Sequence, residues 1–238
     1  MVEERAGDLR VAVRGGDGAA ADAAARVERV GVDEDPDAVV AAGEDAFIAL
    51  AADLPDAPVV PSWNGGGPHV VQPASLARAL EAVAAGDARV DGHPVLAVAV
   101  AGQSVGRALM DVSLVTSDPA RISEYGVHAR GERIEAVRAD GMTVATPVGS
   151  AGYARAAGGP LVAPGTGVAV VPIAPFTTNP VVRVLEPTLA LTVERDERPV
   201  SLVLDDAVRR RVEPHERVDV RRAGTLDVLH VPGLGAEG

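Results

Sequence analysis

The segment of residues 139–164, ADGMTVATPVGSAGYARAAGGPLVAP, constrains the fold of this chain more than any other stretch. It opens on the turn pair Asp140-Gly141 and continues as a short strand-like run over residues 142–146. Proline and glycine then interrupt this strand-like pattern. Tyr153, one of two tyrosines in the chain, follows at once. So many small residues around one aromatic ring suit a surface where backbone and ligand approach closely. A glycine-rich loop that joins two strands of a sheet is the open alternative.

The order and spacing of this segment resemble the second signature of the NAD kinase family. The usual form in that family is DG, a short strand, TPTGSTAY and a run similar to SAGGP. The chain has the same order: Asp140-Gly141, then Thr146-Pro147-Val148-Gly149-Ser150-Ala151-Gly152-Tyr153, then Ala157-Gly158-Gly159-Pro160.

The chain departs from this signature at three positions. Ala151 and Gly152 stand where the family usually has Thr-Ala, and Ala156 stands where it often has Ser, so a hydroxyl that could contact adenosine is missing. The resemblance implies that Asp140 binds the nicotinamide amide or its ribose. It also implies a nucleoside pocket lined by Ser150, Ala151, Gly152 and Tyr153.

A third signature of the family is a strand with Asn-Glu near its centre, which holds adenosine and ribose groups. The matching stretch here is RALMDV, residues 107–112. Asp111 keeps a carboxylate and is expected to bind NAD, whereas Met110 replaces the amide. Methionine packs on a base but does not hydrogen-bond to it as an amide does. An ordinary strand is the alternative interpretation, and we favour it for Met110.

The first signature of the family is GGDG, whose aspartate takes the proton from the ribose 2'-hydroxyl of NAD. The literal string Gly15-Gly16-Asp17-Gly18 comes too early, because in the family the motif follows the second strand. It also precedes a strand that ends in an N-x-G turn, and counting back from Asn64-Gly65-Gly66 leads to Gly43-Glu44-Asp45-Ala46. We therefore predict Asp45 as the catalytic base, with Asp17 as the alternative. A carboxylate at a helix N-terminus, favoured by the helix dipole, is the non-catalytic interpretation of Asp45.

The first part of the chain alternates short strands and helices, which is typical of an α/β domain. From residue 93 onward almost every periodic run is a strand. We predict an α/β, Rossmann-like N-terminal domain over residues 1–92 and a β-rich, β-sandwich-like C-terminal domain over residues 93–238. Strands are expected at 9–13, 38–42, 59–60, 94–101, 109–116, 122–130, 134–138, 168–173, 188–194, 201–204 and 217–220, and helices at 19–30, after 46 and at 73–85. The NAD kinase family is built in this way, with its active site in the crevice between the halves.

Charge excludes two classes of function. The chain has 34 acidic and 22 basic residues, a net charge of -12, and every basic residue is arginine. Without lysine a Walker-type phosphate loop is impossible, and an acidic chain is not expected to bind nucleic acid. A dense carboxylate surface indicates a halophilic protein from a high-salt cytoplasm. A GC-rich genome is the alternative, and it explains arginine better than it explains acidity.

Residue usage also bears on location. Cysteine is absent, so neither disulfides nor thiolate chemistry is available. The opening residues MVEERAGDLR are charged, so no signal peptide is expected. The longest apolar run, residues 95–101, is far too short to cross a bilayer. We therefore expect a cytoplasmic protein with no membrane partner.

Metal-dependent and serine hydrolase functions find little support. No two histidines have the spacing of metal ligands, so no protein metal site is predicted. The residue before Ser150 is itself the glycine, so residues 149–152 do not form a G-x-S-x-G elbow. The five histidines are His69, His93, His128, His215 and His230.

The resemblance implies transfer of the γ-phosphate of ATP to the 2'-hydroxyl of NAD, with Mg²⁺ as cofactor. Such transfer depends on positioning and on neutralised phosphates. Backbone N–H groups at Gly43, Asn64, Gly65 and Gly66 are expected to hold phosphate. Family members commonly share the nucleotide site between subunits, so a homodimer or homotetramer is expected.

Two alternatives to an active kinase stay open. Glu44, Ala46 and Met110 depart from the family signatures, so a catalytically impaired NAD-binding or regulatory relative is the first. A lipid kinase of similar architecture is the second. Residues 146–153 argue against the lipid kinase, because that signature belongs to the NAD-binding side.

Overall fold

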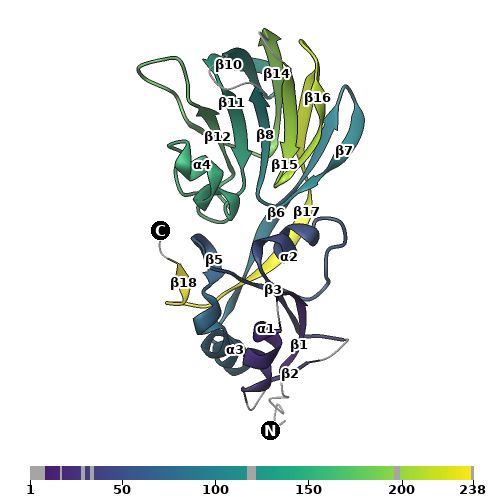
Figure 1. The fold of residues 1–238 in the computed structure, drawn as a ribbon, viewed down its shortest axis with the longest axis vertical. Helices are drawn as coiled ribbons and strands as arrows, with labels where there is room; N and C mark the ends of the chain where they lie inside the picture. The colour runs from purple at the N-terminus through teal and green to yellow at the C-terminus, as the bar shows by residue number, and fades with distance from the viewer. Residues whose placement is uncertain are drawn as a thin grey trace. The chain divides into compact units, whose positions relative to one another are not determined.

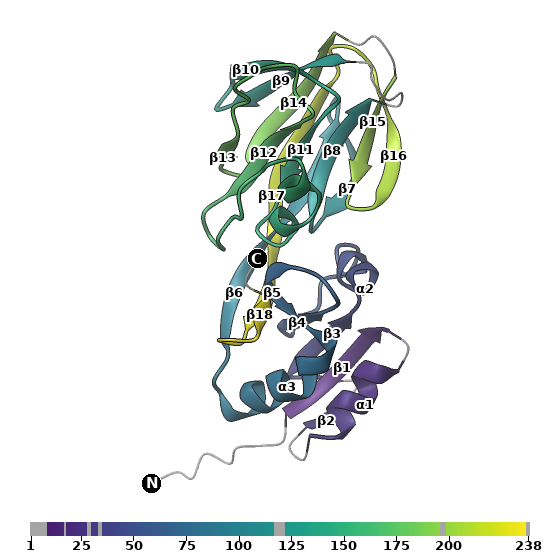
Figure 2. The ribbon, with the colours of Figure 1, turned by 60° about the vertical axis from the view of Figure 1, so that its left-hand side comes forward.

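A computed structural model describes residues 9–16, 18–27, 30–32, 35–116, 122–195 and 199–236. The chain divides into two compact units, one of Met1–Gly92 with Leu226–Glu237 and one of His93–Thr225. Figures 1 and 2 label the elements of both units.

The first unit is built on parallel strands in the order β4-β3-β1-β2. Strand β3 is buried along almost its whole length, as expected of a central parallel strand covered on both faces. The elements are β1 (Leu9–Gly15), α1 (Ala19–Ala25), β2 (Val30–Val32), β3 (Ala38–Ala42), α2 (Glu44–Ala49), β4 (Val59–Ser62), β5 (Gly67–Val71), η1 (Pro73–Ser75), α3 (Leu76–Ala85) and β18 (Gly235–Ala236).

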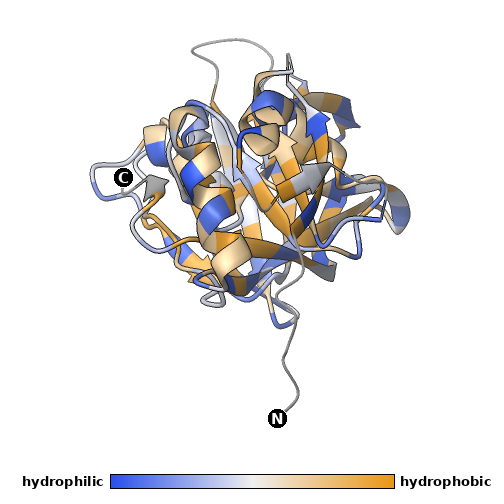
Figure 3. Ribbon diagram, turned by 90° about the horizontal axis from the view of Figure 1, so that it is seen from below, coloured by the Kyte–Doolittle hydropathy of each residue, from blue (hydrophilic) through white to orange (hydrophobic). Residues whose placement is uncertain are grey.

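The core of the first unit joins helices α1 and α3 to the sheet. Helix α3 buries Leu76, Ala79 and Leu80, and it ends at Gly86, whose φ of 81° is the left-handed conformation of a glycine C-cap. Figure 3 shows helices with hydrophilic residues among hydrophobic ones and strands with many hydrophobic residues. This pattern is that of amphipathic helices packed on a buried sheet.

The second unit contains two antiparallel sheets. One has the strand order β13-β12-β11-β8-β15-β16. The other contains β10-β9-β14-β17, with β6 paired to β17 and β7 paired to β6. One buried cluster, which includes Leu96, Leu114, Tyr125 and Leu191, draws side chains from both sheets. The elements are β6 (Arg89–Val100), β7 (Gln103–Ala108), β8 (Asp111–Thr116), β9 (Ser123–Ala129), β10 (Glu132–Ala139), β11 (Gly141–Ala145), η2 (Gly149–Ala151), α4 (Tyr153–Ala156), β12 (Val168–Ile173), β13 (Arg183–Leu185), β14 (Thr188–Arg195), β15 (Val200–Leu204), β16 (Ala207–Val212) and β17 (Arg217–His230).

The predicted fold class, an α/β part followed by a β-rich part, is confirmed. The assignment of residues 93–238 to one domain is wrong at its end, because residues 226–237 belong to the first unit. There Val228 pairs with Val59 of β4, and Leu229 and Val231 are buried in the core of that unit. No helix among the described residues is long and apolar enough to cross a membrane.

One predicted helix is shorter than expected, and one predicted strand is more buried. Helix α1 ends at Ala25, and Val30 instead begins β2, where it pairs with Leu9 of β1. The β-branched valines of residues 30–32 prefer the pleated sheet to the end of a helix. We expect strand β14 to be half-buried, but five consecutive residues of it are buried, and Leu189, Leu191 and Val193 belong to the core of the second unit.

Candidate functional site

The carboxyl ends of β1 and β3, together with helix α2, line a cavity in the first unit. Ligands of parallel α/β sheets bind at this edge, outside the carboxyl ends of the strands. The cavity has a volume of about 500 Å³. It is lined by Arg14, Gly15, Gly16, Ala42, Gly43, Glu44, Asp45, Ala46, Ala49 and Leu50.

Gly43 shapes the turn from β3 into α2. Its φ of 111° and ψ of 150° lie where L side chains are rarely found, so glycine is required there. Its N–H donates to the carbonyl of Ser62 at 2.9 Å, which fixes the end of β3 beside the end of β4. Glu44 and Asp45 follow on the first helical turn, where amide groups lack intrahelical acceptors, and both side chains are exposed. Asp45 thus points out of a well-fixed turn.

The literal GGDG string lies at the same sheet edge as this turn. A side chain at Gly15, which has a φ of 76°, would collide with the Cβ of Ala46 and would lie 2.8 Å from the carbonyl of Ala42. The two glycine-containing turns therefore pack directly against each other. Asp17, the alternative catalytic residue, lies outside the described residues.

The turn after β4 presents the predicted phosphate-binding residues Asn64, Gly65 and Gly66, which are all exposed. A side chain at Gly65 would lie 2.8 Å from the indole of Trp63, and the Gly65 carbonyl accepts from Gln72 Nε2 at 2.7 Å. A second cavity, of about 280 Å³, opens here. It is lined by Gly16, Ala19, Ala20, Ala42, Gly43, Ser62, Trp63, Asn64, Pro73 and Leu76. Gly43 thus borders both cavities, and Gly43, Asp45 and Asn64 lie at one edge of one sheet.

In the second unit, residues 109–111 and 146–150 form one hydrogen-bonded cluster. The hydroxyl of Thr146 donates to the carbonyl of Leu109 at 2.7 Å and lies 3.0 Å from that of Met110. A side chain at Gly149 would collide with the carbonyl of Met110, so the turn can approach this closely only with glycine. The stretches that matched the second and third signatures are thus in contact.

Asp205 holds this cluster from another side, and the sequence analysis did not identify it. Its carboxylate accepts the backbone N–H groups of Leu109, Met110 and Asp111 at 2.7–3.2 Å. Burial raises the pKa of Asp205, and the hydrogen bonds from these amides oppose the rise. The one local signal is that Asp205-Asp206 joins β15 to β16, with Asp205 at a φ of 54°.

Ser150 takes a different role from the predicted one. Its side chain is fully buried, and its hydroxyl donates to the carbonyl of Pro147 at 2.7 Å and accepts the N–H of Val162 at 2.9 Å. It therefore fixes the turn rather than offering a hydroxyl to a ligand. Ala151 is half-buried, whereas Gly152 and Tyr153 are exposed, with Tyr153 at 47%. The aromatic ring is free to stack on a planar ligand.

The structure does not bring Asp140 together with the other predicted NAD-binding residues. Asp111 lies opposite Ala145 and Val115 lies opposite Gly141, so Asp111 and Asp140 are near opposite ends of β11. Asp111 is 9% exposed and lies beside the turn of residues 146–150, with its Oδ1 2.8 Å from the hydroxyl of Ser113. Asp140 is half-buried at the far end.

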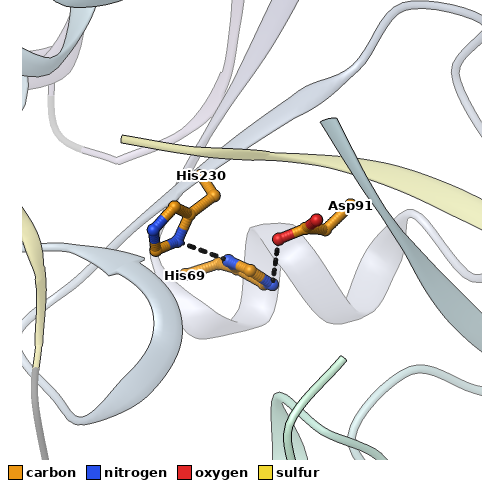
Figure 4. Close-up of side chains that lie close together, drawn as sticks. All are labelled: His69, Asp91 and His230. Carbon is orange, nitrogen blue, oxygen red and sulfur yellow. Dashed lines mark hydrogen bonds and ion pairs between the residues drawn. The ribbon is translucent and has the colours of Figure 1, made fainter. Parts of the chain in front are cut away.

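The histidines are not all scattered, which corrects the sequence-based view. His69 of β5 and His230 of β17 face each other, and Asp91 of β6 lies beside His69 (Figure 4). These residues are far apart in the sequence, so spacing could not reveal them.

Comparison with known proteins identifies relatives of the chain. A family model described as the ATP-NAD kinase C-terminal domain matches residues 109–228. An NAD kinase of Methanopyrus kandleri is 31% identical over 165 residues, which cover 69% of this chain and 56% of that protein. An NAD kinase of Methanospirillum hungatei is 34% identical over 125 residues, which cover 51% of this chain and 46% of that protein. The chain thus spans about half the length of these relatives.

Two solved structures share the fold. A yeast NADH kinase complexed with NADH superposes with a TM-score of 0.73 at 15% identity, covering 93% of this chain and 83% of that one. An NAD kinase from Archaeoglobus fulgidus in complex with ATP superposes with a TM-score of 0.66 at 20% identity, covering 93% of this chain and 92% of that one.

Proposed function

The chain belongs to the NAD kinase family, and from this premise we propose that it transfers the γ-phosphate of ATP to the 2'-hydroxyl of NAD to give NADP. The observation that supports this most directly is the exposed carboxylate of Asp45 beside the 500 Å³ cavity at the carboxyl edge of the parallel sheet. Binding of NADH and ATP is reported for the two similar structures, and we extend it to this chain as part of the proposal.

Asp45 is the general base in this mechanism. Its carboxylate orients the 2'-hydroxyl and accepts its proton as the oxygen forms a bond to the γ-phosphorus. The bond from that phosphorus to the β-phosphate oxygen breaks, and ADP leaves. Little covalent help is needed from the protein, because positioning and charge neutralisation supply most of the rate. Backbone N–H groups at residues 64–66 hold the phosphates. The N–H of Gly43, which was also predicted to bind phosphate, instead donates to the carbonyl of Ser62.

The residues around the cavity also fit Mg²⁺. Glu44 and Asp45 offer carboxylate oxygens, the donors that Mg²⁺ prefers, and both are exposed beside the cavity. When bound, the ion supplies charge neutralisation at the triphosphate. Asp45 would hold it from the protein side, whereas the carboxylate of Glu44 acts on the triphosphate by repulsion.

The second unit supplies the NAD-binding groups. Tyr153 offers an exposed ring, Gly152 leaves room beside it, and Asp111 supplies a carboxylate at the neighbouring turn. Asp140 precedes the five-residue strand β11 and Thr146 follows it, so the two residues lie about 20 Å apart along the strand. We therefore assign Asp140 to the NAD site of a second copy of the chain in a homodimer or homotetramer.

The direct test is purified protein with NAD, ATP and Mg²⁺ in molar KCl, assayed for NADP. High salt is chosen because the chain is acidic, and we also infer a halophilic, cytoplasmic origin. NADP formation is expected. Binding of NAD without any product would favour the regulatory relative instead, an outcome made plausible by Glu44 and Ala46 in place of glycines.

Asp45→Asn tests the assigned base. NAD affinity should change by no more than a few fold, whereas kcat should fall roughly 10²–10⁴-fold, the usual contribution of a positioned base. Asp17→Asn is the matched control and should retain activity. The reverse result, an inactive Asp17→Asn and an active Asp45→Asn, would show that the literal GGDG is the catalytic motif.

A mixture of variants tests the shared site. Asp45→Asn and Asp140→Asn should each have low activity alone. If Asp140 serves a second copy, co-refolded mixtures regain activity, because some sites then contain both native carboxylates. Mixtures that stay as inactive as the two separate variants contradict the assignment of Asp140.

A further inference from the structure

Three side chains from three distant segments meet in the first unit. His69 comes from β5, Asp91 from β6, and His230 is the last residue of β17. One ligand atom from each lies within 4.8 Å of the other two. The two imidazoles face each other through their Nδ1 atoms at 3.2 Å, and His69 Nε2 lies 3.6 Å from Asp91 Oδ2 (Figure 4).

We propose that His69 and His230 bind one divalent transition-metal ion of the Zn²⁺ class through their Nδ1 atoms, with Asp91 orienting the ring of His69 from its Nε2 side. Two nitrogens 3.2 Å apart, each at the usual Zn–N distance of roughly 2.0–2.1 Å, subtend about 100° at the ion, close to tetrahedral. Imidazole suits Zn²⁺, Co²⁺ and Ni²⁺, whereas Mg²⁺ takes oxygen ligands. The site is thus chemically distinct from the cavity beside Asp45.

The surroundings of the three residues favour binding. His69 is 3% exposed, and burial lowers its pKa to about 4, so its ring is neutral and able to ligate at pH 7. His230 and Asp91 are half-buried, which leaves a path for the ion and room for water ligands. Asp91 also contacts the Nε2 of His69, the position from which a carboxylate orients a metal-bound imidazole.

Among the described residues near Asp91, the positively charged Arg89 is the one that opposes binding of a cation. Its Nε lies 3.2 Å from the same Asp91 oxygen, and its side chain is 64% exposed. Because it is exposed, it can turn into solvent when an ion binds. Arg89→Gln should therefore tighten binding of the ion.

The ion would tie the end of β17 to β5 and β6. This is the segment of residues 226–237 that returns to the first unit after the whole second unit. A ligand that binds only the folded chain raises its stability, so saturating Zn²⁺ should raise Tm by roughly 5 °C.

The test is titration of the full-length, chelator-treated chain with ZnCl₂ by calorimetry. Excess MgCl₂ and molar KCl are present throughout, so that surface carboxylates do not bind Zn²⁺ unspecifically. We expect one Zn²⁺ per chain. Co²⁺ should give the visible absorption of a low-coordinate site. Asp91→Asn should weaken binding roughly 10–100-fold, and His69→Gln and His230→Gln by more.

His215→Gln is the matched control, because His215 is exposed and belongs to the second unit. It should bind Zn²⁺ as the native chain does. Circular dichroism identifies any variant that fails to fold. His69 is the most buried of the three residues, so if His69→Gln does not fold, the test depends on His230→Gln and Asp91→Asn. The proposal is contradicted if the native chain binds no Zn²⁺, or if the folded variants bind it as tightly as the native chain does. The two histidines would then be joined only by an N–H···N hydrogen bond.

Discussion

At the scale of single residues, Asp205 shows how one half-buried carboxylate can organise a loop through backbone hydrogen bonds. It accepts the N–H groups of three successive residues, 109–111, from a turn about a hundred positions away in the sequence. The carbonyls of the same loop are held by Thr146. The loop that carries Met110 and Asp111 is therefore held through both its N–H groups and its carbonyl groups.

Asp205→Ala should destabilise the protein by about 2 kcal/mol or more, because it leaves amide groups without their acceptor. Asp205→Asn keeps one acceptor oxygen and should cost less. Urea unfolding measures both changes, and calorimetry should show weaker NAD binding by the folded variants. Asp206→Asn, at the exposed neighbouring position, serves as control and should stay within about 0.5 kcal/mol of the native chain. Equal losses at the two positions would contradict the assigned role.

His69 gives the chain a pH dependence with a definite sign. Burial lowers its pKa to about 4, and the charges of His230 and Arg89 lower it further, whereas Asp91 raises it. The unfolded chain binds a proton on this ring near pH 6.5, and the folded chain does so only near pH 4. The stability contributed is therefore present above pH 6.5 and is lost as the pH falls towards 4.

Urea midpoints measured in chelator from about pH 7 to about pH 4 should fall, and His69→Gln should flatten that fall. His128 also has a pKa lowered mainly by burial, so His128→Gln should remove a further part of the slope. A His69→Gln chain with the full native slope would show that other groups cause it.

At the scale of elements, the proposed function makes the affinity for a triphosphate depend on the turn from β3 into α2. Gly43 has a positive φ there, and in the predicted register Glu44 and Ala46 stand where the family motif has glycines. A carboxylate about 5 Å from a phosphate charge, at an effective dielectric of about 20, repels it by on the order of 3 kcal/mol before salt screening. The expected result is a slow enzyme with weak ATP affinity that depends strongly on cations.

Glu44→Gly should tighten ATP binding at low salt and lose most of that advantage in molar KCl, as measured by calorimetry. Ala46→Gly changes no charge and should show no difference that depends on salt. Ala46→Gly also removes the Cβ that lies close to Gly15, so its effect on the stability of the chain should be measured separately from its effect on ATP binding. If Glu44→Gly weakens ATP at every cation concentration, Glu44 is a metal ligand rather than a source of repulsion.

At the scale of the whole molecule, the fold class could be predicted from the sequence, whereas contacts between residues far apart in the chain could not. The α/β and β-rich parts followed from periodicity, and residues 146–153 were located because one run of small residues carries their chemistry. Asp205 was missed because its partners lie 94–96 positions away, and the pair of His69 and His230 because 161 positions separate them. The return of residues 226–237 to the first unit was missed for the same reason, since only the fold brings Val228 beside Val59.

Net charge gives the last prediction, which concerns stability in salt. A charge of -12 on 238 residues without lysine repels itself in the folded state more than in the expanded chain. At about 1 M salt the Debye length is about 3 Å, so KCl should screen this repulsion and raise Tm. Salt also screens favourable ion pairs, such as Arg10 with Asp37 at 2.8 Å, but this pair is exposed and such pairs contribute little. The gain from screening the repulsion should therefore exceed the loss from screening the ion pairs.

Tm measured by calorimetry should rise steadily from about 0.1 M to about 2 M KCl. Sucrose is the control, because it is excluded from protein surfaces and stabilises without screening charge. The gain in KCl should fall when Asp53→Asn, Asp56→Asn and Glu81→Gln are combined, since these changes reduce the net negative charge and none of the three lines either cavity. A Tm that stays flat or falls with KCl contradicts the halophilic interpretation, and an equal gain in the less acidic variant shows that salt acts by exclusion instead.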